Sequence, residues 1–401
     1  MRAPILLSAA LAASSALAQA APKPPWTELK IKSAKLSETR TAFVALPAAY
    51  ADGRRAFPVL VILDADDRPQ FASALANVAF LASRGATPEL IVVGVPNGKD
   101  RTHDLTPVAT GATSKQFATA GGVSPFMDFV TSELLPEIRA KYRTQPSTIL
   151  AGHSFGGLVA LHAAATRDQF RGVIAMSPSL WWNDSTAARG YADSLEHLTR
   201  PLRLFASSGE FEPAIAIPTA RFASRLDSVK PHALAFAYQH YRTDNHGMTP
   251  LHSLIDGLMF VFQPVSLVRA PVAVLGPTSD SAAVVRAYIA SRQAFAEGAR
   301  SLGLADTTFP ENQTNQLGYA VMQTLKMPRL AVWLFEQNVR DYPRSQNVYD
   351  SLGDGLLAGG DTTGARTQFR RAIAVAREVN EPPNPETQKK LADLEKRSQK
   401  R

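Results

Sequence analysis

The sequence predicts an α/β protein with a mostly parallel sheet flanked by helices, followed by a small all-helical domain. Short apolar runs rich in valine and isoleucine alternate with helical patterns from about residue 27 to residue 265. Three of these runs, PVLVILD, ELIVVGV and GVIAMS, are continuous, as expected of strands buried on both faces of a sheet. Beyond about residue 280 only helical patterns occur, and they contain an internal repeat.

The expected strands and helices alternate along the first part of the chain. Strands are expected at residues 41–47, 57–63, 90–95, 148–151, 172–176, 203–207 and 233–238. Helices are expected at residues 69–82, 125–142, 155–166, 213–229 and 248–262. Such alternation is typical of a parallel sheet that helices cover on both faces. Ligands of these sheets bind at the carboxyl ends of the strands, where we therefore expect a functional site.

The N-terminus, residues 1–20, has the features of a secretory signal peptide. Arg2 precedes an apolar run over residues 5–17, and the alanines at positions 16, 18 and 20 fit an A-x-A cleavage site. The run is too short to span a bilayer. We therefore expect an exported protein, periplasmic or secreted, with no transmembrane segment and a mature α/β domain over residues 21–265.

Composition narrows the class of protein. The 401 residues are 45% hydrophobic and 19% charged, which suits a globular protein with a sizeable core. The net charge of +8 comes from scattered lysines and arginines, which favours a solvated positive surface over a nucleic-acid interface. The chain contains no cysteine, which excludes disulfides, a thiolate nucleophile and a zinc–thiolate site.

Residues 266–283 are expected to be a linker, because the stretch QPVSLVRAPVAVLGPTSDSAA around them contains three prolines. The helical domain then covers residues 284–401. Ala331 and Phe335 recur as Ala365 and Phe369, an offset of 34 residues. This is the period of the tetratricopeptide repeat, so a protein partner is possible for this domain, which is expected to lean on the first. A generic helical hairpin is the alternative.

The pattern Gly-His-Ser-Phe-Gly at residues 152–156 follows an expected strand and precedes an expected helix. In this context it is typical of a nucleophile elbow, where Ser154 is held in a strained conformation that lifts its hydroxyl off the sheet. Side chains at the flanking glycine positions would collide with the neighbouring strand and helix. The amide of Phe155, at the helix N-terminus, is placed to bind an oxyanion. A tight structural turn is the alternative.

A serine hydroxyl needs a base to act as a nucleophile at neutral pH. His246 is the expected base, because it lies in the polar stretch TDNHGMTPLHSLIDGL, after the last expected strand and before a helix. His240 directly follows that strand and remains the alternative.

The acid that orients the base is expected after the strand at 203–207, in FASSGEFEP. Glu212, three residues after the glycine, is preferred. Glu210 is the alternative and Asp184 a more distant one. The order Ser154, Glu212, His246 along the chain is that of α/β-hydrolases. A second oxyanion donor is expected in the turn DADDRP, from the amide of Asp66, although the aspartates there also fit helix N-caps.

Five blocks together resemble the bacterial putative-esterase family, which includes enterobactin and bacillibactin esterases and S-formylglutathione hydrolase. They are ILDADDRPQF, IVVGVPNGKDRTHDLTP, ILAGHSFGGLVAL, SPSLWWND and DNHGMTPLHSLIDGL. The resemblance covers roughly residues 27–265, and the helical tail is similar to that of a bacterial subgroup. It implies Ser154 as nucleophile and His246 as base. Asp64-Ala65-Asp66 stands where many members have Asp-Gly.

The resemblance also implies that the loop DRTHDLTP and the segment SLWW line the substrate pocket. Arg101 lies in the first of these and is expected to clamp an anionic substrate group, with a salt bridge to Asp100 or Asp104 as the alternative. Trp181 and Trp182 are expected to wall the pocket, one of them serving only as core.

The sequence thus predicts an exported serine esterase that forms a covalent ester on Ser154 and needs no metal or organic cofactor. A siderophore lactone is the substrate that the resemblance favours, and acylated carbohydrate esters compete with it. One alternative is an acyltransferase that passes the acyl group to a sugar or lipid hydroxyl. Another is an inert scaffold whose repeat domain recruits a partner.

Overall fold

The computed structural model describes residues 24–53, 55–270, 272, 276 and 279–399. The expected signal peptide at residues 1–20 lies outside the described residues, as do several residues of the expected linker. Among the helices of the described part of the chain, none is both long and apolar enough to cross a membrane.

In the described part of the chain, eight strands form one sheet in the order β1-β2-β4-β3-β5-β6-β7-β8. They are β1 (Thr27–Ser33), β2 (Glu38–Ala45), β3 (Phe57–Leu63), β4 (Ile91–Val95), β5 (Thr144–His153), β6 (Gly172–Met176), β7 (Leu202–Gly209) and β8 (Leu234–Tyr241). The pairs β1–β2 and β2–β4 are antiparallel, and the remaining pairs are parallel. The mostly parallel sheet and the helices around it confirm the α/β-hydrolase fold.

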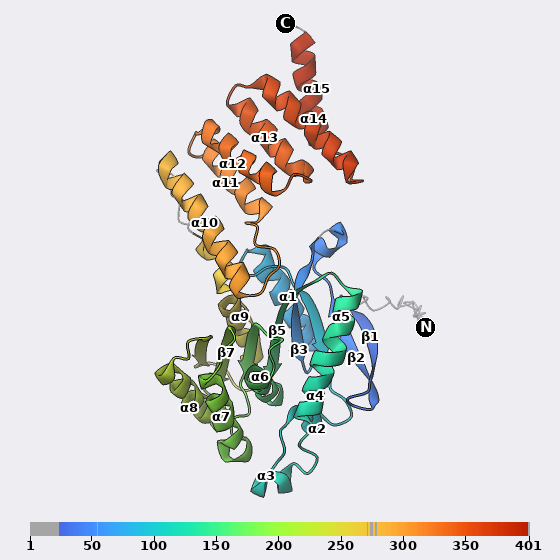
Figure 1. Ribbon diagram of the computed structural model, residues 1–401, viewed down its shortest axis with the longest axis vertical. Helices are drawn as coiled ribbons and strands as arrows, with labels where there is room; N and C mark the ends of the chain where they lie inside the picture. Colours follow the sequence, from blue (N-terminus) through green and yellow to red (C-terminus); the bar gives the residue numbers. More distant parts are fainter. Residues whose placement is uncertain (1–23, 54, 271, 273–275, 277–278, 400–401) are drawn as a thin grey trace, which may run out of the picture.

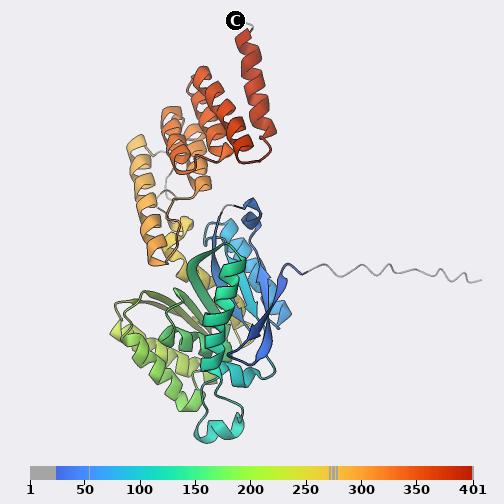
Figure 2. The same cartoon turned by 45° about the vertical axis from the view of Figure 1, so that its right-hand side comes forward.

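Helices cover both faces of the sheet (Figures 1 and 2). One face packs against α4 (Val123–Phe129), α5 (Leu135–Lys141), α6 (Phe155–Thr166), α7 (Trp182–Glu196) and α8 (Pro213–Val229). The π-helical turn η2 (Val130–Leu134) joins α4 to α5. The other face packs against α1 (Arg68–Ser83) and α9 (Thr249–Val261). Two short helices, α2 (Arg101–Leu105) and α3 (Gly111–Gln116), lie between β4 and α4.

Among the strands and α-helices of the α/β part, β1, α2, α3 and α7 were not expected from the sequence. The helices α2 and α3 have only five and six residues, too few to leave a helical pattern in the sequence. β1 was missed because its side chains alternate between exposed and buried, so TELKIKS contains no continuous apolar run. This pattern suits an edge strand, which needs burial on one face only. Helix α7 was missed because only five of its fifteen residues are buried and its first turn is irregular, with positive φ at Asn183, Asp184 and Ser185.

The C-terminal part is helical and lies at one end of the molecule (Figures 1 and 2). It contains α10 (Ser281–Ser301), α11 (Glu311–Gln323), α12 (Pro328–Asp341), α13 (Gln346–Ala358), α14 (Thr362–Glu378) and α15 (Pro385–Gln399). A Cβ atom on Gly318 would lie 2.3 Å from the ring of Phe335, and one on Gly353 would lie 2.4 Å from the ring of Phe369. The two helix pairs thus use the same glycine–phenylalanine contact. Their assignment to the tetratricopeptide class stays a prediction.

The end of α10 packs directly against the α/β part. Ala299, Leu302 and Leu304 belong to the same buried cluster as the side chains of α1 and α9. Gly298 fits tightly against the chain there, because a Cβ atom on it would lie 2.1 Å from the carbonyl oxygen of Pro264. The first helix of the C-terminal part is therefore held by the hydrophobic core of the sheet.

Candidate active site

Ser154 stands in a sharp turn between β5 and α6. Its φ of 60° and ψ of −117° belong to a region that a residue with a side chain rarely adopts and that costs roughly 1–3 kcal/mol. The turn is also crowded, because a Cβ atom on Gly152 would lie 2.2 Å from the carbonyl oxygen of Gly156. The glycines allow the turn to close, and the serine side chain is carried at its tip, at the carboxyl end of β5.

His246 and Glu212 are in direct contact. Nδ1 of His246 lies 2.5 Å from Oε2 of Glu212. Glu212 follows β7 and begins α8, whereas His246 lies in the loop between β8 and α9. Neighbouring parallel strands thus bring together two residues that are 34 positions apart in the sequence. A carboxylate in this position fixes the tautomer of the imidazole, leaving Nε2 free to accept a proton.

Glu212 is held in its ionised form. Its side chain is only 4% exposed, and burial alone would raise the pKa of the carboxyl group. Hydrogen bonds from His246, from Ser177 Oγ (2.6 Å to Oε1) and from the amide of Gly209 outweigh this effect and lower the pKa. Both carboxylate oxygens are therefore occupied, which fixes the orientation of the group. The contribution of Ser177, which follows β6, was not foreseen from the sequence.

The ring of His153 connects the elbow to the base. Its centroid lies 4.3 Å from that of His246. Because His153 directly precedes Ser154, this contact puts the imidazole of His246 beside the nucleophile elbow. Burial, followed by the charge on His246, lowers the pKa of His153 to about 3, so this ring stays neutral. No role for His153 was expected from the sequence.

The hydroxyl of Ser154 lies 3.5 Å from that of Ser179, and among the described residues no hydrogen bond joins it to His246. The nucleophile–base bond of such sites is often long before a substrate binds. Ser179 also donates its backbone amide to the carbonyl of Ser154, at 3.1 Å. The segment after β6 therefore supports the turn of Ser154 through two contacts of Ser179.

The two alternative residues for the acid and the base pair with each other. Nε2 of His240 lies 2.7 Å from Oε2 of Glu210. The side chain of His240 is 34% exposed and that of Glu210 is 54% exposed, whereas that of Glu212 is 4% exposed. The carboxylate of Glu210 is therefore far more solvated than that of Glu212. Asp184, the third alternative, lies in the irregular first turn of α7, and its carbonyl oxygen accepts a hydrogen bond from Arg189.

The loop that carries His246 is anchored by Asp244, a residue that sequence reasoning missed. Asp244 is 2% exposed, and its Oδ2 lies 2.7 Å from Nδ1 of His252 on α9. Its carbonyl oxygen accepts a hydrogen bond from the amide of Phe211, which precedes Glu212. Asp244 thus ties the loop of His246 to both α9 and the turn of Glu212.

The amides of Phe155 and Asp66, the expected oxyanion donors, have no hydrogen-bond acceptor among the described residues. Phe155 is the first residue of α6, where amides are free of intrahelical bonds. The turn of Asp66 lies beside the elbow, since a Cβ atom on Gly156 would approach Oδ2 of Asp64 to 2.9 Å. The preceding amide, that of Ala65, is taken by the carbonyl of Val95.

Arg101 binds neither Asp100 nor Asp104 but Asp64, which the sequence analysis had not considered as its partner. Nε and Nη2 of Arg101 lie 2.5 Å and 2.9 Å from the two oxygens of Asp64. The Nε–Nη2 edge of the guanidinium is therefore occupied by Asp64. Burial would lower the pKa of Arg101, but the bonds to Asp64 outweigh it and raise the pKa. Arg101 thus ties the start of α2 to the turn of Asp64 and Asp66, and its role in clamping an anionic substrate group stays a prediction.

A polar cavity of about 230 Å³ adjoins this pair. Asn97 bridges two of the aspartates in its wall, donating to Asp64 at 2.8 Å and to Asp66 at 2.9 Å. The ring of His153 forms part of the lining. Nε2 of His153 is buried and has no hydrogen-bond partner in the described structure. The cavity therefore offers carboxylate and amide oxygens as hydrogen-bond acceptors to a polar ligand.

Trp181 and Trp182 have different environments. Trp182 is fully buried in the main core, so it does not line a pocket, and the expectation that one tryptophan is only core applies to it. Trp181 is partly exposed and packs on the ring of Phe155 at 6.1 Å and on that of Phe117 at 5.8 Å. Trp181 thus reaches the residue that follows the nucleophile.

No group of three or more histidine, aspartate or glutamate side chains in the described residues is arranged to hold a metal ion.

A family model described as Putative esterase matches residues 33–245, which is more than half of the chain. The chain belongs to this family. The membership confirms the resemblance noted from the sequence and places the chain among serine hydrolases of the esterase class. The match ends one residue before His246, so the loop of the base lies at its boundary.

Two curated relatives of this esterase family member are fungal. The siderophore triacetylfusarinine C esterase of Aspergillus fumigatus is 36% identical over 156 residues, which cover 35% of this chain and 51% of the relative. The siderophore enterobactin esterase of Emericella nidulans is 33% identical over 109 residues, which cover 26% and 33%. The chain therefore spans about half the length of the first relative and about a third of the length of the second. These partial matches do not establish the substrate of this protein.

Among solved structures, an IroE-like serine hydrolase from Shewanella oneidensis matches with a TM-score of 0.66 and 25% identity, covering 79% of this chain and 99% of that one. An uncharacterised protein from Capnocytophaga ochracea matches with a TM-score of 0.62 and 16% identity, covering 92% and 99%. The second match covers 92% of this chain, so it includes helices of the C-terminal part. The likeness in fold to the Capnocytophaga ochracea protein therefore extends beyond the α/β part.

Proposed function

We propose that the protein hydrolyses carboxylic esters through a covalent ester on Ser154. The contact between His246 and Glu212, beside the strained turn of Ser154, is the observation that carries this proposal. His246 is the base, Glu212 orients it, and the amides of Phe155 and Asp66 bind the oxyanion. Family membership supports the same reaction class.

The reaction has two halves. In the first, Ser154 Oγ attacks the ester carbonyl carbon while His246 Nε2 takes the hydroxyl proton. The tetrahedral intermediate collapses, and the same proton passes to the leaving alcohol. In the second, His246 takes a proton from water, the resulting hydroxide attacks the acyl-serine, and the proton returns to Ser154 as the acid is released. The charge on the carbonyl oxygen is stabilised in both halves by the two amides.

A siderophore lactone is the substrate that the names of the two fungal relatives support. The setting proposed for this activity is outside the cytoplasm, after removal of residues 1–20, whose composition supports export. Residues 284–401 are proposed as a tetratricopeptide-like domain for a protein partner, and residues 266–283 as the segment that joins it to the esterase domain at 21–265.

The experiment is an ester panel assayed with the mature chain, and it includes p-nitrophenyl acetate and ferric siderophore lactones. The wild type should release acid and alcohol, and Ser154→Ala should not. A matched variant, Ser114→Ala, removes an exposed serine that bonds only within α3 and should retain activity. Product analysis with added sugar and lipid alcohols separates hydrolysis from acyl transfer. A wild type that consumes none of the esters would contradict the proposal.

A further inference from the structure

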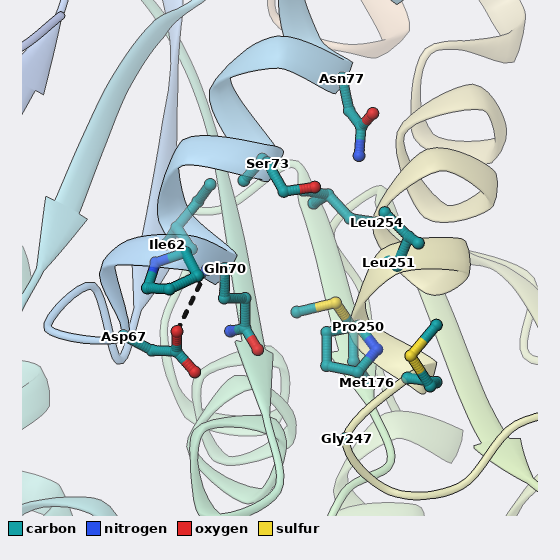
Figure 3. A pocket seen from close by; sticks show the side chains of 13 residues that line it. Ile62, Asp67, Gln70, Ser73, Asn77, Met176, Gly247, Pro250, Leu251 and Leu254 are labelled. Carbon is teal, nitrogen blue, oxygen red and sulfur yellow. Dashed lines mark hydrogen bonds between the residues drawn. The ribbon is translucent and has the colours of Figure 1, made fainter. Parts of the chain in front are cut away.

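A second hollow lies between α1 and α9, next to the reacting centre (Figure 3). Its volume is about 280 Å³, which suits one arm of a substrate rather than a whole drug-sized ligand. The buried side chains of Ile62 and Met176, from the ends of β3 and β6, form its floor. Since β5 lies between these two strands, the hollow sits over the strand that leads to Ser154. We call it the α1–α9 groove.

The two walls of the groove differ in character. Gln70, Ser73 and Asn77 follow one another on one face of α1 and present two amides and a hydroxyl. Leu251 and Leu254 of α9 present aliphatic surface on the other side, as Figure 3 shows. A ligand in the groove therefore meets hydrogen-bonding groups along one side and apolar surface along the other.

The groove is continuous with the active site. Asp67 and Gln70 line both the α1–α9 groove and the polar cavity beside Arg101. Gly247, which follows His246, lines the groove from the other side. The groove thus reaches from the turn that contains Asp66 and Asp67 to the loop that carries His246, within reach of an arm of an ester bound at Ser154.

The groove has no cation to offer. Among the described residues that line it, Asp67 alone is charged, and its carboxylate caps α1 by accepting the amide of Gln70 at 3.1 Å. An anionic group placed there would lose hydration without gaining a positively charged partner, and it would lie near the carboxylate of Asp67. A neutral chain with amide or hydroxyl groups would bond to the α1 wall and bury its methylenes against α9.

We propose that the α1–α9 groove binds an uncharged, amide- or hydroxyl-bearing arm of the ester substrate and selects it over an anionic arm. The proposal rests on the proposed function, because the arm is defined by an ester that reacts at Ser154. The groove adjoins both the oxyanion turn and the base, so the arm belongs to either the acyl or the alcohol side, and the test covers both.

The test compares matched p-nitrophenyl esters: acetate, hexanoate, the monoamide of adipate and adipate itself with its free carboxylate. The wild type should favour hexanoate and the monoamide over acetate by roughly tenfold or more in kcat/KM, because methylenes are buried in the groove. The carboxylate-ended ester should lack this gain. The alcohol side is tested in the same way with acetate esters of hexanol, 6-hydroxyhexanamide and 6-hydroxyhexanoate.

Two variants locate the effect. Ser73→Trp fills the groove and should remove the chain-length gain, whereas Ala79→Trp, exposed on the same helix outside the groove lining, should keep it. Leu251→Lys, at a side chain that is 39% exposed, adds a cation to the apolar wall and should shift preference toward the carboxylate-ended ester by at least about tenfold. Leu251→Lys places no large side chain in the interior, so it remains informative if Ser73→Trp folds poorly.

The outcomes separate the two proposals. A chain-length gain in either series that Ser73→Trp abolishes and Ala79→Trp does not supports the groove as the arm site. Acetate turnover without any gain, or a gain that survives Ser73→Trp with unchanged selectivity in Leu251→Lys, overturns it while leaving ester hydrolysis intact. A wild type that turns over no ester in either series instead contradicts the proposed function.

Discussion

The Nδ1 atom of His246 lies 2.5 Å from Oε2 of Glu212, in a pair whose carboxylate is almost entirely buried. In a second imidazole–carboxylate pair, His240 with Glu210, the carboxylate is much more exposed, at 54% against 4% for Glu212. Only Glu212 also receives hydrogen bonds from Ser177 and the amide of Gly209. The two pairs therefore differ in rigidity, which makes them separable by substitution.

Replacing Glu212 by glutamine is expected to lower kcat by roughly 10³- to 10⁴-fold with little change in KM. The amide keeps the shape of the side chain but removes the charge that stabilises the imidazolium and fixes its tautomer. Steady-state kinetics on a p-nitrophenyl ester measure the effect.

The matched control is Glu210→Gln, which removes the carboxylate of the exposed pair and is expected to change kcat by less than about twofold, as surface ion pairs contribute little. If the losses are reversed, with Glu210→Gln inactive and Glu212→Gln active, Glu210 is the acid.

For the base, His246→Ala is expected to reduce turnover by about 10⁴-fold or more, because Ser154 then has no proton acceptor. His240→Ala should retain most of the activity. Both variants should show the far-ultraviolet circular dichroism of the wild type, since each side chain is partly exposed. Retained turnover in His246→Ala together with loss in His240→Ala would assign the base to His240.

Arg101→Lys should lower kcat/KM by about tenfold. Lysine keeps the positive charge but cannot make the two-point contact with Asp64, so the turn that carries the amide of Asp66 becomes less rigid. Arg55→Lys is the control, because Arg55 pairs with Glu89 at an exposed site and precedes β3, whereas the turn follows the other end of that strand. Equal kinetics for wild type and Arg101→Lys would show that the oxyanion turn does not depend on the paired guanidinium.

Because the pKa of His153 is lowered in the folded protein, the free energy of unfolding is expected to depend on pH. Its pKa is about 3 in the folded protein, against about 6.5 in an unfolded chain. Above pH 6.5 the ring is neutral in both states and contributes no pH dependence. As the pH falls from 6.5 toward 3, the unfolded chain binds a proton that the folded protein does not, so the free energy of unfolding decreases, by about 2 kcal/mol at pH 5.

Urea unfolding at pH 7.5, 6 and 5 measures this slope. His153→Gln, which has no ring to protonate, should lose about 2 kcal/mol less than the wild type between pH 7.5 and pH 5. Parallel pH profiles for the two proteins would mean that His153 is not kept neutral by burial.

The sequence predicts the fold well where buried residues form a recognisable pattern along the chain. The continuous apolar runs of β3 and β6 give their bounds directly, and the five-residue motif around Ser154 gives the elbow. β1 escapes this reasoning because an edge strand alternates, and α7 escapes it because its first turn is not helical. Both need the rest of the sheet to specify their structure.

The site is less predictable, because its contacts cross between strands that are far apart in the sequence. Asp100 directly precedes Arg101, and Asp104 follows it by three residues. Arg101 nevertheless binds Asp64, because the parallel pairing of β3 and β4 brings the ends of these strands together. The roles of Ser177 and Asp244 likewise depend on which turns meet at the edge of the sheet. Trp182 is adjacent to Trp181 but points into the core, a choice that only three-dimensional packing decides.

The measurement that tests the covalent mechanism most directly is the mass of the protein after reaction with a fluorophosphonate ester, followed by peptide mapping. The account predicts a single adduct on Ser154 in the wild type, no adduct in Ser154→Ala, and labelling slowed by several orders of magnitude in His246→Ala. A wild type that stays unlabelled, or an adduct that persists at another residue in Ser154→Ala, would contradict it.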